Sequence, residues 1–133
     1  MNLSILLLLS AVLITGLFVP AYAQSISEHV IINEVDTNPP GDDSKSISEW
    51  VELFNPTDSD VDISGWEIAS TTVLKKTFTI PDNVIISSGD YLTFVYSKVW
   101  FTDTAESVEL KNTNGIVIDK TREIYDLDND SKT

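Results

Sequence analysis

The stretch EWVELFNPTDSDVDISGW, residues 49–66, contains two strand-like runs joined by a polar connector. The first run alternates between two faces, as the side chains of a strand do. One face presents Val51 and Leu53, and the other presents Trp50, Glu52 and Phe54. Asn55-Pro56 ends this run because proline cannot donate a ladder hydrogen bond. Ser64-Gly65 provides a turn before a second run that starts at Trp66, so the stretch predicts a β module with an aromatic anchor.

Similar short runs continue along the chain, separated by Gly, Pro, Asn and Asp residues that favour turns. The predicted strands are residues 30–35, 49–55, 66–70, 78–80, 84–86, 91–96, 107–111 and 116–119. In the first strand we expect Val30 and Ile32 on one face, and Ile31 and Val35 on the other. Asn112–Gly115 is a hairpin signal before the last strand. Without a helical period after residue 23, this pattern predicts an all-β fold, either an antiparallel sandwich or a barrel.

Residues 1–23 contain no charged side chain and include an apolar run at residues 5–19. The small residues Ala21 and Ala23 match the pattern of a signal peptidase site. We therefore expect residues 1–23 to be a helical signal peptide, followed by a polar spacer at residues 24–29. An uncleaved membrane anchor is the main alternative, although about 15 apolar residues are near the lower limit for a span. A buried core helix is a further alternative.

All charged residues of the 133-residue chain follow residue 23, and 21 acidic against 8 basic residues give a net charge of −13. This excess argues against a nucleic-acid partner, which needs clustered Lys and Arg. It favours a soluble monomer and a cationic partner, a divalent ion or a basic surface layer. The chain has no cysteine, which excludes disulfides and thiolate metal sites. Its core must therefore hold the domain, and the expected aromatic members are Trp50, Phe54, Trp66, Phe78 and Phe94.

The candidate catalytic groups are one histidine and a set of carboxylates. A Ser-His-Asp relay would need His29 beside an activated serine, but the sequence pairs it with no particular serine, so an exposed or edge-strand histidine is favoured. Four carboxylates would approach one another if their strands are neighbours, and paired carboxylates serve glycoside hydrolysis. These four are Glu34, Asp36, Glu49 and Glu52. Strand-edge carboxylates that accept backbone N–H groups are the favoured alternative.

Two sets of alternating aspartates are candidate calcium ligands, because calcium prefers carboxylate oxygens. The first set is Asp58, Asp60 and Asp62, and the second is Asp126, Asp128 and Asp130. Neither set continues into the full calcium-loop signature. A solvated turn is favoured for both, less strongly for the second.

Residues Trp100 and Phe101 lie in a connector and have two interpretations. They would form either an exposed patch that contacts carbohydrate or protein, or core packing beneath the connector. Core packing is favoured.

Six segments, in their order and spacing, resemble a lamin tail domain. They are IINEV (31–35), EWVELFNPT (49–57), DISGW (62–66), FTIP (78–81), GDY (89–91) and VELKNTNGIVID (108–119). The resemblance implies an immunoglobulin-like β-sandwich over residues 30–120. Relatives commonly continue past a stretch like residues 129–133 into another strand. Residues 121–133 are therefore expected to be an acidic tail or a truncated last strand.

In animals this family forms the globular tail of nuclear lamins, and in prokaryotes similar domains occur on exported and surface proteins. The resemblance thus implies a recognition or attachment role without catalytic residues. We expect an exported, non-catalytic binding module at the cell surface, whose partner is a surface protein or cell-envelope component. The alternatives are a calcium-binding extracellular module and the accessory domain of a longer secreted hydrolase. No catalytic, cofactor or metal residue is assigned.

Overall fold

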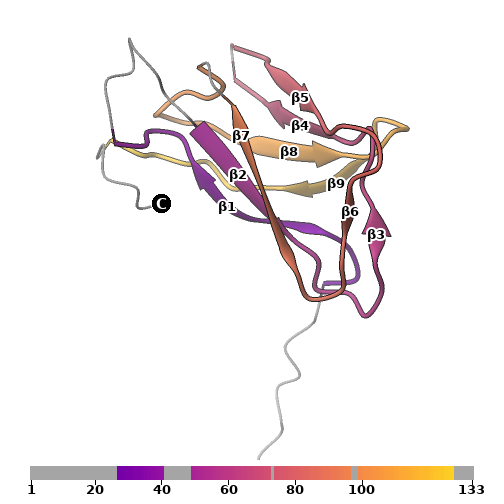
Figure 1. Ribbon diagram of the computed structural model, residues 1–133. Helices are drawn as coiled ribbons and strands as arrows, with labels where there is room; N and C mark the ends of the chain where they lie inside the picture. Colours follow the sequence, from indigo (N-terminus) through magenta and orange to yellow (C-terminus); the bar gives the residue numbers. More distant parts are fainter. Residues whose placement is uncertain (1–26, 41–48, 73, 97–98, 128–133) are drawn as a thin grey trace, which may run out of the picture.

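The structure is a computed structural model that describes residues 27–40, 49–72, 74–96 and 99–127. Within these residues, nine strands pair in antiparallel fashion (Figure 1). They are β1 (Ile31–Asp36), β2 (Glu49–Phe54), β3 (Val61–Asp62), β4 (Glu67–Ser70), β5 (Thr77–Thr79), β6 (Ile85–Ile86), β7 (Tyr91–Tyr96), β8 (Val108–Lys111) and β9 (Val117–Lys120). The predicted leader, residues 1–23, lies outside the described residues. The described residues include no helix with the length and hydropathy of a membrane span.

The strands form two main layers and a small pair at one end (Figure 1). One layer is a three-stranded sheet in the order β1-β2-β7, and the other is a four-stranded sheet in the order β5-β4-β8-β9. Strands β3 and β6 pair separately. The predicted all-β fold is confirmed as an immunoglobulin-like β-sandwich.

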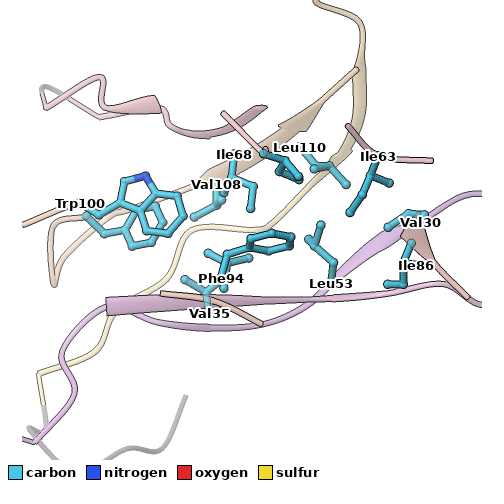
Figure 2. Packing of buried hydrophobic residues seen from close by; sticks show 13 residues of the cluster. Val30, Val35, Leu53, Ile63, Ile68, Ile86, Phe94, Trp100, Val108 and Leu110 are labelled. Atoms are coloured by element: carbon cyan, nitrogen blue, oxygen red, sulfur yellow. The ribbon is translucent and has the colours of Figure 1, made fainter. Parts of the chain in front are cut away.

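The core lies between the two sheets, where apolar side chains of one layer point toward those of the other (Figure 2). The three-stranded sheet contributes Val35, Val51, Leu53 and Phe94, and the four-stranded sheet contributes Ile68, Val108 and Leu110. Burying one such side chain contributes about 1.5–3 kcal/mol. This core follows from the alternating pattern of β2, whose Val51 and Leu53 are fully buried.

The aromatic part of the core differs from the expectation. Trp100 and Phe101 are buried, and their rings stack with centroids 4.5 Å apart. The alternative of an exposed contact patch at these two residues is therefore wrong. Trp50 and Phe54 are outside the core cluster, because they are on the side of β2 opposite to Val51 and Leu53. Among the other expected aromatics, Phe94 is buried, whereas Trp66 and Phe78 pack against the cluster while partly exposed.

Strand β1 contains an irregularity that changes which side chains face the core. Ile32 is opposite Leu53 and Val35 is opposite Val51, with a register shift between Ile32 and Glu34. An extra residue in one strand reverses the alternation beyond it. The expectation that Ile32 and Val35 lie on different faces is therefore wrong.

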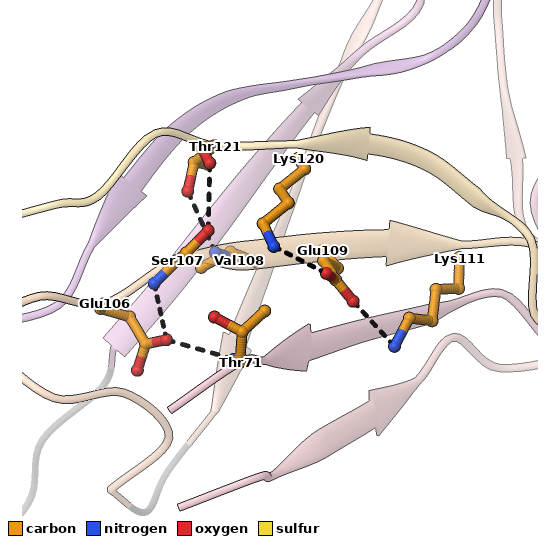
Figure 3. Close-up of polar contacts among 8 residues, drawn as sticks. All are labelled: Thr71, Glu106, Ser107, Val108, Glu109, Lys111, Lys120 and Thr121. Carbon is orange, nitrogen blue, oxygen red and sulfur yellow. Dashed lines mark hydrogen bonds and ion pairs between the residues drawn. The ribbon is translucent and has the colours of Figure 1, made fainter. Parts of the chain in front are cut away.

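A buried carboxylate joins three segments at the end of the sandwich where β8 begins. Glu106 is fully buried and accepts hydrogen bonds from the hydroxyls of Ser70 and Thr72 and from the amide of Thr102, each at 3.0 Å. It also accepts from the amides of Thr71 and Ser107 (Figure 3). These donors satisfy the charge and fix the loops that carry them.

The predicted hairpin at Asn112–Gly115 is confirmed between β8 and β9. Gly115 has a φ of 74°, a left-handed conformation that glycine adopts without steric cost. The Asn112 side chain accepts hydrogen bonds from the amides of Asn114 and Ile116 at 3.0 and 3.1 Å. This turn explains why β9 returns along β8.

Candidate functional site

The candidate site is the solvent-facing side of the β1-β2-β7 sheet, which we call the outer face. The pairing register arranges its side chains in three rows across the strands. The first row is Ile31, Phe54 and Tyr91; the second is Glu34, Glu52 and Thr93; the third is Asp36, Trp50 and Val95. Neighbours within a row are roughly 5 Å apart, and successive rows are about 7 Å apart. Two rows rich in apolar side chains therefore flank a polar, acidic row.

The first row is aromatic and accessible. The rings of Phe54 and Tyr91 stack with centroids 4.4 Å apart and an interplanar angle of 21°. Tyr91 is 54% exposed, and Val95 in the third row is 55% exposed. Rigid, accessible aromatic side chains are typical of surfaces that bind a partner.

The middle row holds a carboxylate in a fixed position. One oxygen of Glu52 accepts a hydrogen bond of 2.8 Å from the side-chain amide of Asn33, and the other lies 3.5 Å from the Thr93 hydroxyl. Glu34 is directly opposite Glu52 on β1. Because both donors to Glu52 are neutral, they orient its carboxylate and leave its charge in place.

The third row contains a second carboxylate beside an indole. Asp36 is buried and accepts hydrogen bonds from the Trp50 indole at 3.1 Å and from the Asn38 amide at 3.2 Å. Burial raises the pKa of Asp36 above its ordinary value, and the carboxylates of Asp126 and Glu34 act in the same direction. The two hydrogen bonds oppose that rise. The negative charges at this edge are thus close enough to disfavour one another.

On the opposite sheet, the carboxylate of Glu109 is paired with two lysines. Glu109 on β8 forms ion pairs of 2.9 Å with both Lys111 and Lys120 (Figure 3). The hydrogen bonds from these two ammonium groups lower the pKa of Glu109. By contrast, β1 and β2 place three carboxylates on the outer face, Glu34, Asp36 and Glu52, and β1, β2 and β7 contain no Lys, Arg or His. The outer face is therefore the acidic side of the sandwich.

The four predicted carboxylates do not gather into one site. Glu49 shares the inward side of β2 with Val51 and is only 2% exposed, whereas Glu52 points outward. Among the described residues, no three His, Cys, Asp or Glu side chains are close enough to hold a metal ion. Glu34 and Glu52 do approach one another, because β1 and β2 pair and place these two residues directly opposite on the outer face, whereas Glu49 is separated from them on the inward side.

Glu49 instead holds the backbone of the connector between β7 and β8. One of its oxygens accepts hydrogen bonds from the amides of Trp100 and Phe101. Burial raises the pKa of Glu49 to about 7, although these two amides oppose the rise. The favoured interpretation, a carboxylate that accepts backbone N–H groups, is correct for Glu49.

His29 precedes β1 and is exposed, as the favoured interpretation of the sequence expected. The hydroxyl of Ser27 lies 3.4 Å from its Nδ1 atom, within the same short loop. Such a local contact on the surface does not resemble the buried arrangement of a Ser-His-Asp relay.

The first aspartate set is used by separate turns. Asp58 accepts from the Ser59 hydroxyl, Asp60 from the Ser88 amide and Asp62 from the Ser64 amide. Hydrogen bonds from Ser64 lower the pKa of Asp62. The solvated turn is therefore the better interpretation of this set. In the second set, Asp128 and Asp130 lie outside the described residues, so calcium binding there stays a prediction.

A groove of about 400 Å³ separates β1 from the segment that follows β9. Its lining includes Glu34, Arg122 and Glu123, together with apolar side chains such as Ile124. Its charges are mixed, so this groove does not provide the converging carboxylates that a hydrolytic cleft would need.

The sequence did not single out Tyr91, Val95 or Asn33 as members of a site. The alternation of β7 was visible, but the pairing of β7 with β2 was not. That pairing places Tyr91 beside Phe54 and Thr93 beside Glu52.

Comparison with known proteins agrees with this architecture. A family model described as the Lamin Tail Domain matches residues 23–125. A search of curated proteins finds no match to the chain. Since the family match covers most of the chain and coincides with the immunoglobulin-like sandwich, the chain belongs to the lamin tail domain family.

Proposed function

We propose that this protein is an exported, non-catalytic binding module that attaches to a surface protein or cell-envelope component through its outer face. The observation that supports this function best is the combination of accessible aromatic and aliphatic rows with a fixed carboxylate between them. Accessible aromatic and aliphatic side chains beside a polar row on one face of a sheet are the composition expected of a surface that binds a partner.

The strands beneath this surface are well suited to hold it rigid. Val51, Leu53 and Phe94 fill the core on the reverse side of the same sheet, so the backbone that positions the outer face is anchored by packing. A preorganised surface loses little conformational entropy when a partner binds. The lamin tail family, moreover, is a non-enzymatic immunoglobulin-like domain family, which fits a binding role.

Export is supported by the sequence at the amino terminus. Residues 1–23 have the composition of a secretory leader, and the family match begins at residue 23, where that leader is predicted to end. The same face would also serve if the chain were the accessory part of a longer secreted hydrolase, so that alternative stays a prediction.

The proposal is tested by retention on isolated cell envelopes. The face variant combines Tyr91→Ser with Val95→Thr, and the control variant combines Ile116→Thr with Val117→Thr at the exposed β8–β9 hairpin. Both variants remove exposed apolar surface, and melting temperatures verify that both fold. We expect the original protein and the control variant to be retained on the envelopes, and the face variant not to be retained. Equal retention of all three proteins, or of none, would contradict the proposal.

A further inference from the structure

We propose that the outer face binds an extended, basic polypeptide segment in which Lys or Arg is flanked two residues away on each side by an apolar residue. This inference rests on the proposed function and names the partner class. It follows from the order of the rows on β2 and β7, which is aromatic (Phe54 and Tyr91), then polar and acidic (Glu52 and Thr93), then apolar (Trp50 and Val95) along the strand direction.

The spacing of the rows matches one face of an extended chain. Side chains at positions i, i+2 and i+4 of a strand lie on the same side and repeat about every 7 Å. A segment lying along the strand direction would therefore place three successive side chains over the three rows. The central one meets Glu52, while its neighbours meet the Phe54–Tyr91 stack and Val95.

Charge complementarity selects a cation for the central position. The oxygens of Glu52 are oriented by Asn33 and Thr93, which are neutral donors. The strands of this sheet contain no basic residue, whereas Glu109 on the opposite sheet already has two lysines. A Lys or Arg side chain would pair with the carboxylate of Glu52, and its aliphatic stem would lie against the flanking rings.

Other ligand classes fit the outer face less well. A membrane surface is usually anionic and would be repelled by a chain with a net charge of −13. A neutral sugar would stack on Tyr91 but would leave the charge of Glu52 without a counterpart. A basic polypeptide satisfies both the apolar rows and the acidic row.

The test uses ¹⁵N-labelled protein and three short capped peptides. The probe is acetyl-Leu-Ser-Arg-Ser-Leu-amide; one comparison peptide has Glu in place of Arg, and the other has Ser in place of both Leu residues. We expect the probe to shift the amide signals of β2 and β7 residues in the outer face. Both comparison peptides should bind at least fivefold more weakly than the probe. High salt should lower the affinity of the probe, because it screens the attraction between Arg and Glu52.

Two variants locate the charge that matters. Glu52→Gln removes the central carboxylate, and Glu67→Gln removes a half-buried carboxylate from β4 in the opposite sheet. We expect about five- to tenfold weaker binding of the probe for Glu52→Gln and no change for Glu67→Gln. Melting temperatures verify that both variants fold.

The inference is overturned by equal binding of the Arg and Glu peptides, by shifts outside the outer face, or by no shift at all. It is also overturned if anionic vesicles or oligosaccharides, but not the probe, shift the outer face. If such a result is found while retention on envelopes still depends on Tyr91 and Val95, the basic-polypeptide partner is wrong and the proposed function stands. If that retention is lost as well, the proposed function fails with it.

Discussion

The carboxylate of Glu49 holds the backbone of Trp100, which lies 51 residues further along the chain. Its Oε2 atom accepts hydrogen bonds of 2.5 Å from the Trp100 amide and 2.7 Å from the Phe101 amide. These two amides belong to buried residues of a connector outside the named strands, and each would otherwise cost about 1–3 kcal/mol if left without a partner. Glu49 thus allows an irregular segment to bury two aromatic side chains.

The stability of the fold should depend on pH through Glu49. Its pKa is raised on folding from 4.5 to about 7, so its contribution is complete below pH 4.5 and is lost as the pH rises through 7. We expect the loss to be about 2 kcal/mol once solvent screening is allowed for. Urea unfolding at several pH values between 4.5 and 8 measures it.

The variant Glu49→Gln isolates this effect, because a neutral amide of the same shape has no charge to desolvate. Its stability relative to the original protein should rise by about 2 kcal/mol between pH 5 and pH 8. A constant difference between the two proteins over that range would mean that Glu49 is not the titrating group.

Trp100 should contribute far more to stability than Phe54. Trp100 is fully buried and contacts the rings of Phe78, Tyr96 and Phe101, so Trp100→Ala should cost about 3–5 kcal/mol. Phe54→Ala removes an outward ring and its stack with Tyr91, at a cost of about 1–2 kcal/mol. Chemical denaturation of the two variants compares them, and similar losses would contradict this assignment of core and surface.

Removal of the Glu106 carboxylate should destabilise the end of the sandwich at which β8 begins. Glu106→Ala leaves several buried donors unsatisfied, including the Thr102 amide and the Ser70 hydroxyl, and should cost about 3–5 kcal/mol. Glu106→Gln keeps an acceptor and should cost less than half as much. As a matched control, Glu123→Ala at an exposed position should change stability by less than about 0.5 kcal/mol. Thermal unfolding of the three variants shows whether their losses of stability follow this order.

The leader is tested by the mass of the exported protein. When the full chain is produced in a bacterial host, we expect mature protein outside the cytoplasm that begins at Gln24. Mass spectrometry of the secreted or envelope fraction reads this terminus directly. Recovery of only the full-length chain from the membrane fraction would support the anchor alternative instead.

The sequence predicted the strands better than the side-chain partners. Alternation in β2 was enough to separate Val51 and Leu53 from Trp50 and Phe54, but it did not decide which of the two faces is buried, and in the structure it is the face of Val51 and Leu53. Glu49 is on the same side of β2 as Val51 and Leu53 and is also buried, but a carboxylate is seldom buried without partners. Its partners are backbone amides of a distant connector, which no local pattern reveals.

The outer face was hidden for a related reason. Its rows exist because β2 pairs with β1 on one side and with β7 on the other, across 41 residues between Glu52 and Thr93. The bulge in β1 also has no clear sequence signal, and it decides that Val35 faces the core. The arrangement of the outer face and the burial of Val35 are therefore determined by long-range strand pairing, which local propensity does not predict.

Site-specific photo-crosslinking in cells that export the protein tests the role of the outer face most directly. A photoreactive amino acid replaces Thr93 in the centre of the outer face, or Val117 on the opposite sheet as the control; both positions are exposed. We predict a defined covalent adduct from position 93, its loss when Glu52→Gln is added, and none from position 117. Adducts from position 117 but not from position 93, or from neither, would contradict the assignment of the outer face as the binding surface.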